Sequence, residues 1–222
     1  MENNINFEVF LFLSPEKLIL SVNHKTDYEL IFKEEFLIKN NSNYLNFEEL
    51  NFFLDKNIFK VEKILGNFIE KINVIIKTKD FLDLKISLKK NDYNENINPN
   101  TILYLIKDAK YQCEKTIQNM KIIHILIDSY LIDNIRFTEL PFNNKCKNFS
   151  LDISFIYFPD ELIKKIEKTL RKFQISVNKI LSANYVDKFA NDKNINFFKM
   201  TSKIIDGYNK NEVRLVDKIS KN

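Results

Sequence analysis

Short apolar runs separated by polar turns open the chain. Three of them are rich in Phe, Leu, Ile and Val, and they span residues 7–13, 17–23 and 28–38. Ser14-Pro15 separates the first two, and the polar segment 23–27 separates the second from the third. Runs of this length between turn residues predict three antiparallel strands in a meander.

The spacing of apolar residues changes after residue 46. They now recur at intervals of three and four, as Phe47, Leu50, Leu54, Ile58, Val61, Leu65, Phe68 and Ile72. This period predicts one amphipathic helix over residues 46–72, or two nearly continuous ones. Asn46 followed three positions later by Glu49 is typical of a capping box. We expect Leu50, Leu54, Val61, Leu65 and Phe68 to be buried, and Lys56, Lys63 and Asn67 to face water.

Strands and helices alternate in the rest of the chain. Strand-like runs span residues 73–78, 82–88, 121–131, 149–158 and 177–183, and helical patterns begin at Pro99, at Asp160 and at Asn194. Polar clusters at 91–100 and 141–147 predict loops, and we place the seam between two units at the first of them. The first unit holds the meander and its long helix, and the second holds a smaller sheet with two helices on one face. Helices segregated onto one face predict an α+β fold.

Composition and charge exclude several classes. The chain has 222 residues, of which 45% are hydrophobic and 13% aromatic, so it can bury a core. A net charge of +4 is small against 34 basic and 30 acidic residues that are interspersed, which disfavours a nucleic-acid partner. No stretch approaches the roughly 20 apolar residues of a membrane span. Two isolated cysteines, Cys113 and Cys146, suit a reducing compartment, so we expect a cytoplasmic protein without a disulfide.

Residues that could carry chemistry are sparse. The two glycines, Gly66 and Gly207, lie within helical patterns, so a glycine-rich phosphate loop is excluded. His24 lies in a turn cluster, and His124 lies in an apolar strand where we expect a packed or hydrogen-bonded role. Cys113 falls on the apolar face of a helix, where cysteine behaves as a small apolar residue. We therefore predict no enzymatic activity, no cofactor and no metal site.

The second half of the chain resembles the bacterial cell-division protein FtsA, a member of the actin superfamily. Residues 122–134 are similar to an FtsA strand that ends in Tyr and Asp-Gly, with Asn134 in the place of the glycine. Asn still permits a left-handed turn. The strand, helix and return strand of that family are matched by residues 149–157, 160–173 and 175–183. Together these segments resemble its small SHS2-type subdomain, 1C.

The first half resembles FtsA subdomain 1A, but it departs from the family at the phosphate-binding turn. Residues 10–22 are similar to the first hairpin of that subdomain, and residues 196–208 to its near-terminal helix. In the family this hairpin binds ATP phosphates through an aspartate-x-glycine-threonine turn. Here Phe12 replaces the carboxylate, Ser14 replaces the glycine, and Pro15 removes a backbone donor. The second phosphate loop of the family is also missing after Tyr185.

The resemblance implies an organisation, which touches most of this chain but about half of the parent protein. Residues 1–92 with 185–212 would form the 1A-like subdomain, 93–184 the SHS2-like subdomain, and 213–222 a flexible tail. The tail has too few apolar residues for a membrane helix. This predicts a partial actin-like architecture inside the α+β class.

The function that the resemblance implies is assembly without catalysis. We expect a non-catalytic FtsA-like protein in the cytoplasm that contacts divisome proteins or an FtsA-like protein, with the division site as its place of action. Two alternatives stay open at this point. One is a divergent ATP-binding protein of the actin superfamily, and the other is an α+β binding domain unrelated to division.

Overall fold

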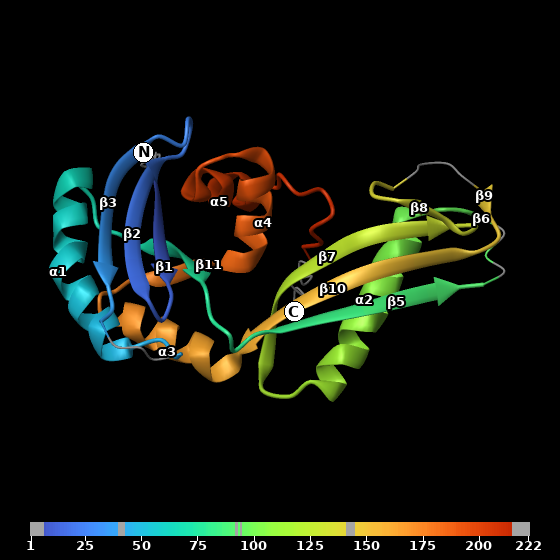
Figure 1. Ribbon diagram of the computed structural model, residues 1–222, viewed down its shortest axis with the longest axis horizontal. Helices are drawn as coiled ribbons and strands as arrows, with labels where there is room; N and C mark the ends of the chain where they lie inside the picture. The colour runs from blue at the N-terminus through green and yellow to red at the C-terminus, as the bar shows by residue number, and fades with distance from the viewer. Residues whose placement is uncertain (1–6, 40–42, 92, 94, 141–144, 215–222) are drawn as a thin grey trace, which may run out of the picture. The chain divides into compact units, whose positions relative to one another are not determined.

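The computed structural model describes residues 7–39, 43–91, 93, 95–140 and 145–214. They form two compact units, and the chain passes from one to the other at three places (Figure 1). The first unit comprises the described residues of Met1–Phe81 and Asp160–Tyr208, and the second those of Leu82–Pro159 and Asn209–Asn222. Each unit contains a sheet with one or more helices packed on it, which confirms the α+β class.

A five-stranded mixed sheet forms the centre of the first unit. Its strand order is β11-β4-β1-β2-β3, with bounds β1 (Phe7–Leu13), β2 (Lys17–His24), β3 (Leu30–Leu37), β4 (Lys71–Ile76) and β11 (Ser176–Ser182). Strands β1, β2 and β3 pair antiparallel, which confirms the predicted meander, and β4 pairs parallel with both β1 and β11. Strand β2 alone therefore runs antiparallel to the other four strands. This arrangement is consistent with the predicted partial actin-like fold.

Helices cover both faces of this sheet. They are α1 (Phe47–Leu65), α3 (Asp160–Arg171), α4 (Ala183–Lys193) and α5 (Phe197–Ile205). Figure 1 shows α1 on one face of the sheet and α4 with α5 on the other. The interior strands are accordingly buried along almost their whole length, for example β1 from Val9 onward and β4 from Ile72 onward.

Helix α1 begins where the sequence predicts and ends earlier. The side-chain oxygen of Asn46 accepts hydrogen bonds from the backbone N–H groups of Glu48 and Glu49, at 3.0 and 3.2 Å. At the other end Gly66 adopts a left-handed conformation (φ 65°), which stops the helix. The prediction that one helix reaches residue 72 is therefore wrong, because Ile72 belongs to β4 and Phe68 is 83% exposed.

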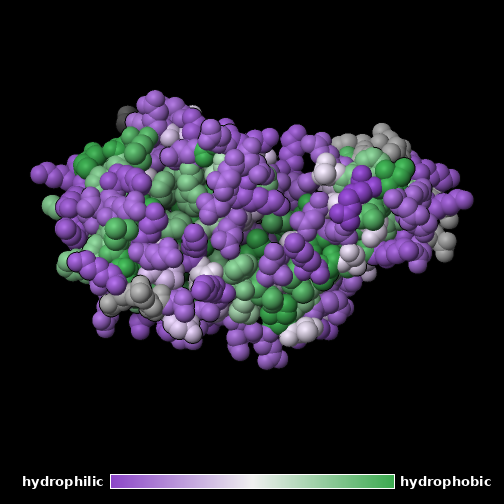
Figure 2. All heavy atoms as spheres, viewed as in Figure 1, coloured by the Kyte–Doolittle hydropathy of each residue, from purple (hydrophilic) through white to green (hydrophobic). Residues whose placement is uncertain are grey.

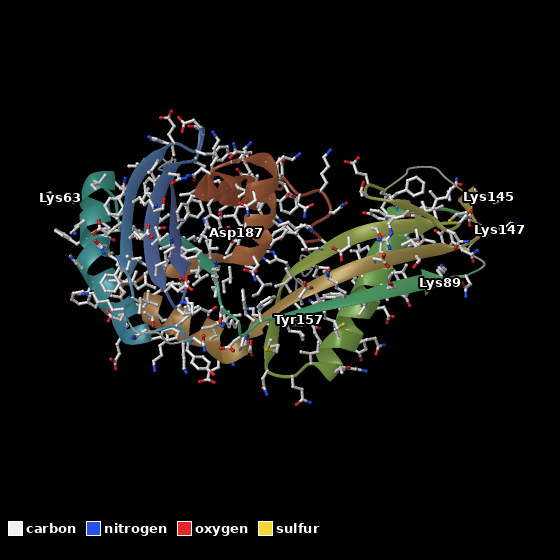
Figure 3. All side chains as sticks on the ribbon, viewed as in Figure 1. Lys63, Lys89, Lys145, Lys147, Tyr157 and Asp187 are labelled. Atoms are coloured by element: carbon white, nitrogen blue, oxygen red, sulfur yellow. The ribbon has the colours of Figure 1, made fainter. Side chains whose placement is uncertain are left out.

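The predicted faces of α1 are otherwise largely confirmed. Leu50, Leu54 and Val61 are buried, and Leu65 is half-buried. The residues predicted to face water are exposed, namely Lys56, Lys63 and Asn67. Figure 3 shows the side chain of Lys63 pointing away from the sheet.

The second unit is a four-stranded antiparallel sheet with one helix on it. The strand order is β5-β10-β7-β8, and the elements are β5 (Leu82–Lys90), β7 (Met120–Ile132), β8 (Ile135–Phe137), β10 (Phe149–Pro159) and α2 (Pro99–Thr116). A small pair is formed by β6 (Glu95–Asn96) and β9 (Lys145–Cys146). Helix α2 begins at Pro99, as predicted, and buries Ile102, Ile106, Ala109 and Cys113 in the core of the unit.

The turn between β7 and β8 bears out the expectation for Asn134. Asp133 and Asn134 both have positive φ, 46° and 72°. Asp133 also accepts hydrogen bonds on its side chain from the backbone N–H groups of Lys147 and Asn148. Asn tolerates the left-handed region, so the turn forms without glycine.

The compact units differ from the predicted spans 1–92 with 185–212 and 93–184. Helix α3 and strand β11 lie in the first unit, because β11 completes the large sheet by parallel pairing with β4. Strand β5 lies in the second unit, because it pairs with β10. The small sheet therefore carries α2 rather than two helices. Helix α4 and strand β8 were not predicted, and the last helix begins at Phe197 rather than at residue 194.

Three further expectations concern the ends and the cysteines. The backbone N–H of Val213 donates to the carbonyl of Ile125, so the predicted tail starts as part of the second unit, and residues 215–222 lie outside the described residues. Part of the predicted loop 141–147 also lies outside them. Cys113 and Cys146 are both free and buried. Among the described helices, none has the length and apolar character needed to cross a membrane.

The packing of α1 predicts two different responses to the same truncation. Replacing Leu54, which has no exposed surface, with Ala should lower the free energy of unfolding by about 2 to 5 kcal/mol, because it removes buried methyl groups and leaves a cavity. Replacing Ile64, which is 54% exposed on the same helix, should change it by about 0.5 kcal/mol. Urea unfolding of both variants measures the difference, and equal losses would contradict the observed orientation of the helix.

Candidate binding groove beside the first hairpin

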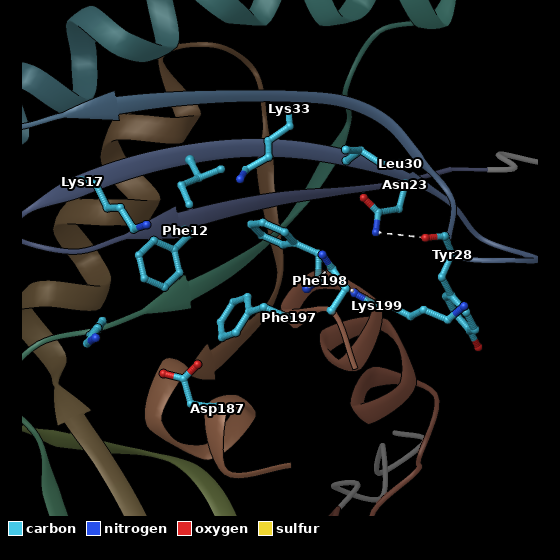
Figure 4. Close-up of a pocket in the computed structure, with 13 residues that line it drawn as sticks. Phe12, Lys17, Asn23, Tyr28, Leu30, Lys33, Asp187, Phe197, Phe198 and Lys199 are labelled. Carbon is cyan, nitrogen blue, oxygen red and sulfur yellow. Dashed lines mark hydrogen bonds between the residues drawn. The ribbon is translucent and has the colours of Figure 1, made fainter. Parts of the chain in front are cut away.

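A groove of about 490 Å³ lies in the first unit, between the β1–β3 meander and the helices α4 and α5 (Figure 4). Its lining combines three kinds of side chain. Phenylalanines come from β1 and from the start of α5, lysines come from three segments of the sheet and from α5, and one carboxylate, Asp187, comes from α4. The groove therefore lies beside the hairpin in which the sequence placed the degenerate phosphate turn.

Aromatic rings, among them that of Phe12, form the base of the groove. Phe12 is 6% exposed and packs edge-on against Phe197, with 5.6 Å between ring centroids and an interplanar angle of 84°. Phe197 in turn packs edge-on against Phe198, which contacts Phe10. Such edge-to-face contacts stabilise aromatic clusters beyond simple burial. Position 12 thus connects β1 to α5 through an apolar contact.

The turn between β1 and β2 satisfies its own hydrogen bonds. The Ser14 hydroxyl donates to the carbonyl of Lys17 at 3.0 Å, and its oxygen accepts from the backbone N–H groups of Glu16 and Lys17 at 3.3 and 2.9 Å. The backbone N–H of Ser14 also donates to the carbonyl of Lys17. Pro15 has no N–H. Every backbone N–H from residue 14 to 17 is therefore bonded within the turn.

This arrangement is the opposite of a phosphate cradle. A cradle needs several backbone N–H groups that converge on open space, usually with glycine so that the ligand can approach. Here Ser14 is 2% exposed and its hydroxyl occupies the concave side of the turn. The three positions that the sequence singled out, Phe12, Ser14 and Pro15, lie in this hairpin.

Lysines give the groove a cationic rim. Lys17 lies at the start of β2, Lys33 in β3, Lys77 directly after β4 and Lys199 in α5. Lys17 forms a 2.9 Å ion pair with Glu35, and Lys33 lies 3.4 Å from the same carboxylate. The hydrogen bond from Lys17 holds the pKa of Glu35 below its usual value.

Tyr28 fixes one end of the groove. It has a positive φ of 63°, and its hydroxyl donates to the carboxylate of Asp206 at 3.1 Å. Partial burial and that acceptor raise the pKa of the phenol, so it stays a donor at neutral pH. Asn23 donates to the carbonyl of Tyr28 at 3.5 Å, as Figure 4 shows, and the Lys199 ammonium lies 6.0 Å from the centre of the Tyr28 ring.

The remaining candidate residues from the sequence lie outside this groove. His24 is exposed at the end of β2. His124 is 3% exposed in the second unit, with Nδ1 2.7 Å from the Glu212 carboxylate, which confirms the packed and hydrogen-bonded role. Burial raises the pKa of the Cys146 thiol, as expected for an unreactive cysteine. The described residues contain no group of three or more His, Cys, Asp or Glu that could hold a metal ion.

Several groove residues escaped the sequence analysis. Lys77 directly follows strand β4, and Asp187 lies on α4, a helix that was not predicted. The two residues are 110 positions apart in the chain. No local motif links them. The aromatic pair Phe197-Phe198 was visible as part of an amphipathic segment, and its contact with Phe12 depends on the fold.

Comparisons with known proteins assign the chain to no family. No family model matches it, and no curated protein matches it. Solved structures that resemble it include the cytoplasmic domain of EpsL, an inner-membrane component of the type II secretion system of Vibrio cholerae. That match has 11% identity and a TM-score of 0.42, and it covers 81% of this chain and 58% of EpsL.

Two further matches have similar values. The PilM-PilN type IV pilus biogenesis complex matches at 9% identity and a TM-score of 0.49, over 84% of this chain and 50% of that one. A Bacteroides thetaiotaomicron protein with an actin-like ATPase fold and unknown function matches at 14% identity and 0.34, over 85% and 57%. The chain thus spans half to three fifths of the length of these proteins.

The turn predicts a specific loss of stability. Replacing Ser14 with Ala removes the acceptor of two partly buried N–H groups, so the free energy of unfolding should fall by about 1 to 3 kcal/mol. Replacing Ser176, an exposed serine whose hydroxyl donates to the carbonyl of Glu70, should cost about 0.5 kcal/mol because water can take its place. Urea unfolding measures both changes. Equal costs would show that the Ser14 hydroxyl does not hold the turn.

Proposed function

We propose that this chain is a non-enzymatic assembly protein that acts by binding other proteins and does not use ATP. The observation that carries the proposal is the closed turn at Ser14, whose backbone donors are all used inside the turn. Phe12 supports it, because an aromatic ring packed on Phe197 stands where a nucleotide-binding relative would need a carboxylate. A protein that keeps the sheet and loses the phosphate contacts is suited to binding rather than to hydrolysis.

The chemistry of the groove favours an acidic protein segment as its occupant. Four lysines and one carboxylate line it, over a base of three phenylalanines. Such a surface binds carboxylates at its rim and an apolar side chain at its base. Two of the lysines, Lys17 and Lys33, lie within ion-pair distance of the Glu35 carboxylate, and a carboxylate of a partner would make the same type of contact. A partner segment with acidic residues around an aliphatic or aromatic one fits both features.

Within the actin superfamily we propose an FtsA-like role in cell division. Its support is the ordered resemblance of residues 10–22, 122–134, 149–157, 160–173 and 175–183 to FtsA. The partners would then be divisome proteins or an FtsA-like protein, and the chain would act in the cytoplasm at the division site. Division and cell-wall genes beside the gene for this chain would favour this role. Neighbours that encode a different assembly would contradict it and would leave the binding function standing.

The competing function is ATP binding, and the lysine-rich rim is the feature that favours it. Isothermal titration of the full chain with Mg-ATP distinguishes the two. We expect no binding heat, because the turn offers no backbone donors to the phosphates. If binding heat appears, a matched titration of the Lys77→Glu variant shows whether the nucleotide binds in the groove.

A dissociation constant in the micromolar range for the wild-type chain, weakened in the Lys77 variant, would place a nucleotide in the groove. That result would overturn the proposed function. If the wild-type chain and the Lys77 variant bound Mg-ATP equally well, the nucleotide would bind outside the groove. That result would also contradict the proposed function.

A further inference from the structure

Strand β5 is the outer strand of the small sheet in the second unit. It pairs with β10 in continuous register over nine residues, from Leu82 opposite Tyr157 to Lys90 opposite Phe149. The pairing of β10 with β7 is interrupted twice by register shifts, whereas the β10–β5 register has none. A long and regular outer strand presents a row of backbone donors and acceptors to a further strand. Bulges and prolines, which usually prevent such pairing, are missing from it.

The chain itself covers the opposite edge of this sheet. Strand β8 pairs with one end of β7, and the segment around Glu212 pairs with its middle through the bridge between Leu126 and Glu212. Two backbone hydrogen bonds of 2.9 Å join this segment to β7, from Ile127 to Asn211 and from Val213 to Ile125. Among the described residues, the edge that lacks such a cover is therefore that of β5.

The side chains of β5 divide cleanly between the two faces. Leu84, Ile86 and Leu88 pack on the core under α2, yet they remain half-buried because no strand flanks them on one side. The other face is exposed and carries Asp83, Lys85, Ser87 and Lys89. Figure 3 shows Lys89 at the far end of β5. An added strand would cover the apolar row and would meet the charged row.

The charges along β5 are complementary to those of a second β5 strand that runs antiparallel to it. In an antiparallel pair of two β5 strands centred on Ile86, Asp83 of each copy lies opposite Lys89 of the other, and Leu84 lies opposite Leu88. Opposite charges that face each other across strands stabilise the pair, and like charges destabilise it. The adjacent registers that keep both faces aligned are centred on Lys85 or on Ser87. They place Lys85 opposite itself or opposite Lys89, so the register centred on Ile86 is favoured.

Strand β3, one of the two outer strands of the large sheet, does not offer the same match. A self-pair of β3 centred on Lys33 or on Glu34 places that charged residue opposite its own copy. Lys33 is also already within 3.4 Å of Glu35 on its own strand. Within the described residues, Asp83 and Lys89 form no ion pair.

We propose that β5 is a self-association surface, on which two copies of the chain pair antiparallel about Ile86 to form one continuous eight-stranded sheet. The contact is one strand wide on each side, so it falls in the small class of interfaces and is reversible. The occupant is a second copy because the charge pattern is self-complementary. The proposal does not depend on the groove of the first unit or on its function.

Charge reversal and its rescue test the pairing. Sedimentation velocity of the full chain over a range of concentrations should show a monomer–dimer equilibrium. Asp83→Lys and Lys89→Asp should each weaken dimerisation about tenfold, because each replaces two attractive pairs with two repulsive ones. The double variant, in which the two charges are exchanged, should restore dimerisation to within about threefold of the wild type. Lys121→Glu, an exposed reversal on β7, is the matched control and should change nothing.

Three outcomes would overturn the proposal. The first is a monomer at every concentration, with far-UV circular dichroism that shows the chain folded. The second is a dimer that neither single reversal weakens. The third is a dimer that both reversals weaken and the double variant fails to restore, because general charge effects rather than cross-strand pairs would then explain the loss.

Discussion

The hydroxyl of Ser14 closes the turn that joins β1 to β2, and the candidate groove depends on that closure. One side chain binds the backbone N–H groups of Glu16 and Lys17 and the carbonyl of Lys17. Because the turn is short and internally bonded, β1 and β2 stay paired to their ends, with Leu13 opposite Leu18. Lys77 then joins the same end of the sheet through its backbone hydrogen bond to Leu13. These contacts place the backbones of the rim lysines Lys17 and Lys77 at the same end of the sheet.

The same constraint separates the fold from the chemistry that its resemblance implies. A turn binds phosphate through backbone N–H groups that point into open space. In this chain those donors are used internally, and the space beside them is occupied by Phe12 and Phe197. What remains is a surface with an apolar base and a cationic rim, which is suited to a protein segment.

Local patterns predicted the elements well and their assembly less well. The meander and helix α2 follow from apolar spacing and from turn residues, all of which lie within short windows of sequence. The end of α1 was misjudged because Phe68 and Ile72 continue the helical spacing, although Gly66 stops the helix, Phe68 is exposed and Ile72 is buried in β4. Figure 2 shows hydrophobic groups among the hydrophilic side chains of the visible face, so exposure cannot be inferred from residue type alone.

Neither the boundary between the units nor the groove could be predicted from local sequence patterns, because both depend on contacts between distant segments. Strand β11 pairs in parallel with β4 about a hundred positions earlier, where the Ser176 hydroxyl donates to the carbonyl of Glu70. Parallel pairing needs a long connection, and here the second unit lies within that connection. Asp187 reaches the groove by the same route. The turn residues Phe12, Ser14 and Pro15, in contrast, could be singled out from the sequence, because they are neighbours in a single hairpin.

The turn at Ser14 uses its backbone N–H donors within the hairpin. A ¹H–¹⁵N correlation spectrum of the full chain, titrated with Mg-ATP, tests it at the atoms concerned. The amide resonances of Ser14, Glu16 and Lys17 should stay in place throughout the titration. Saturable shifts of all three would show that the turn opens and donates to phosphate, and would contradict this account.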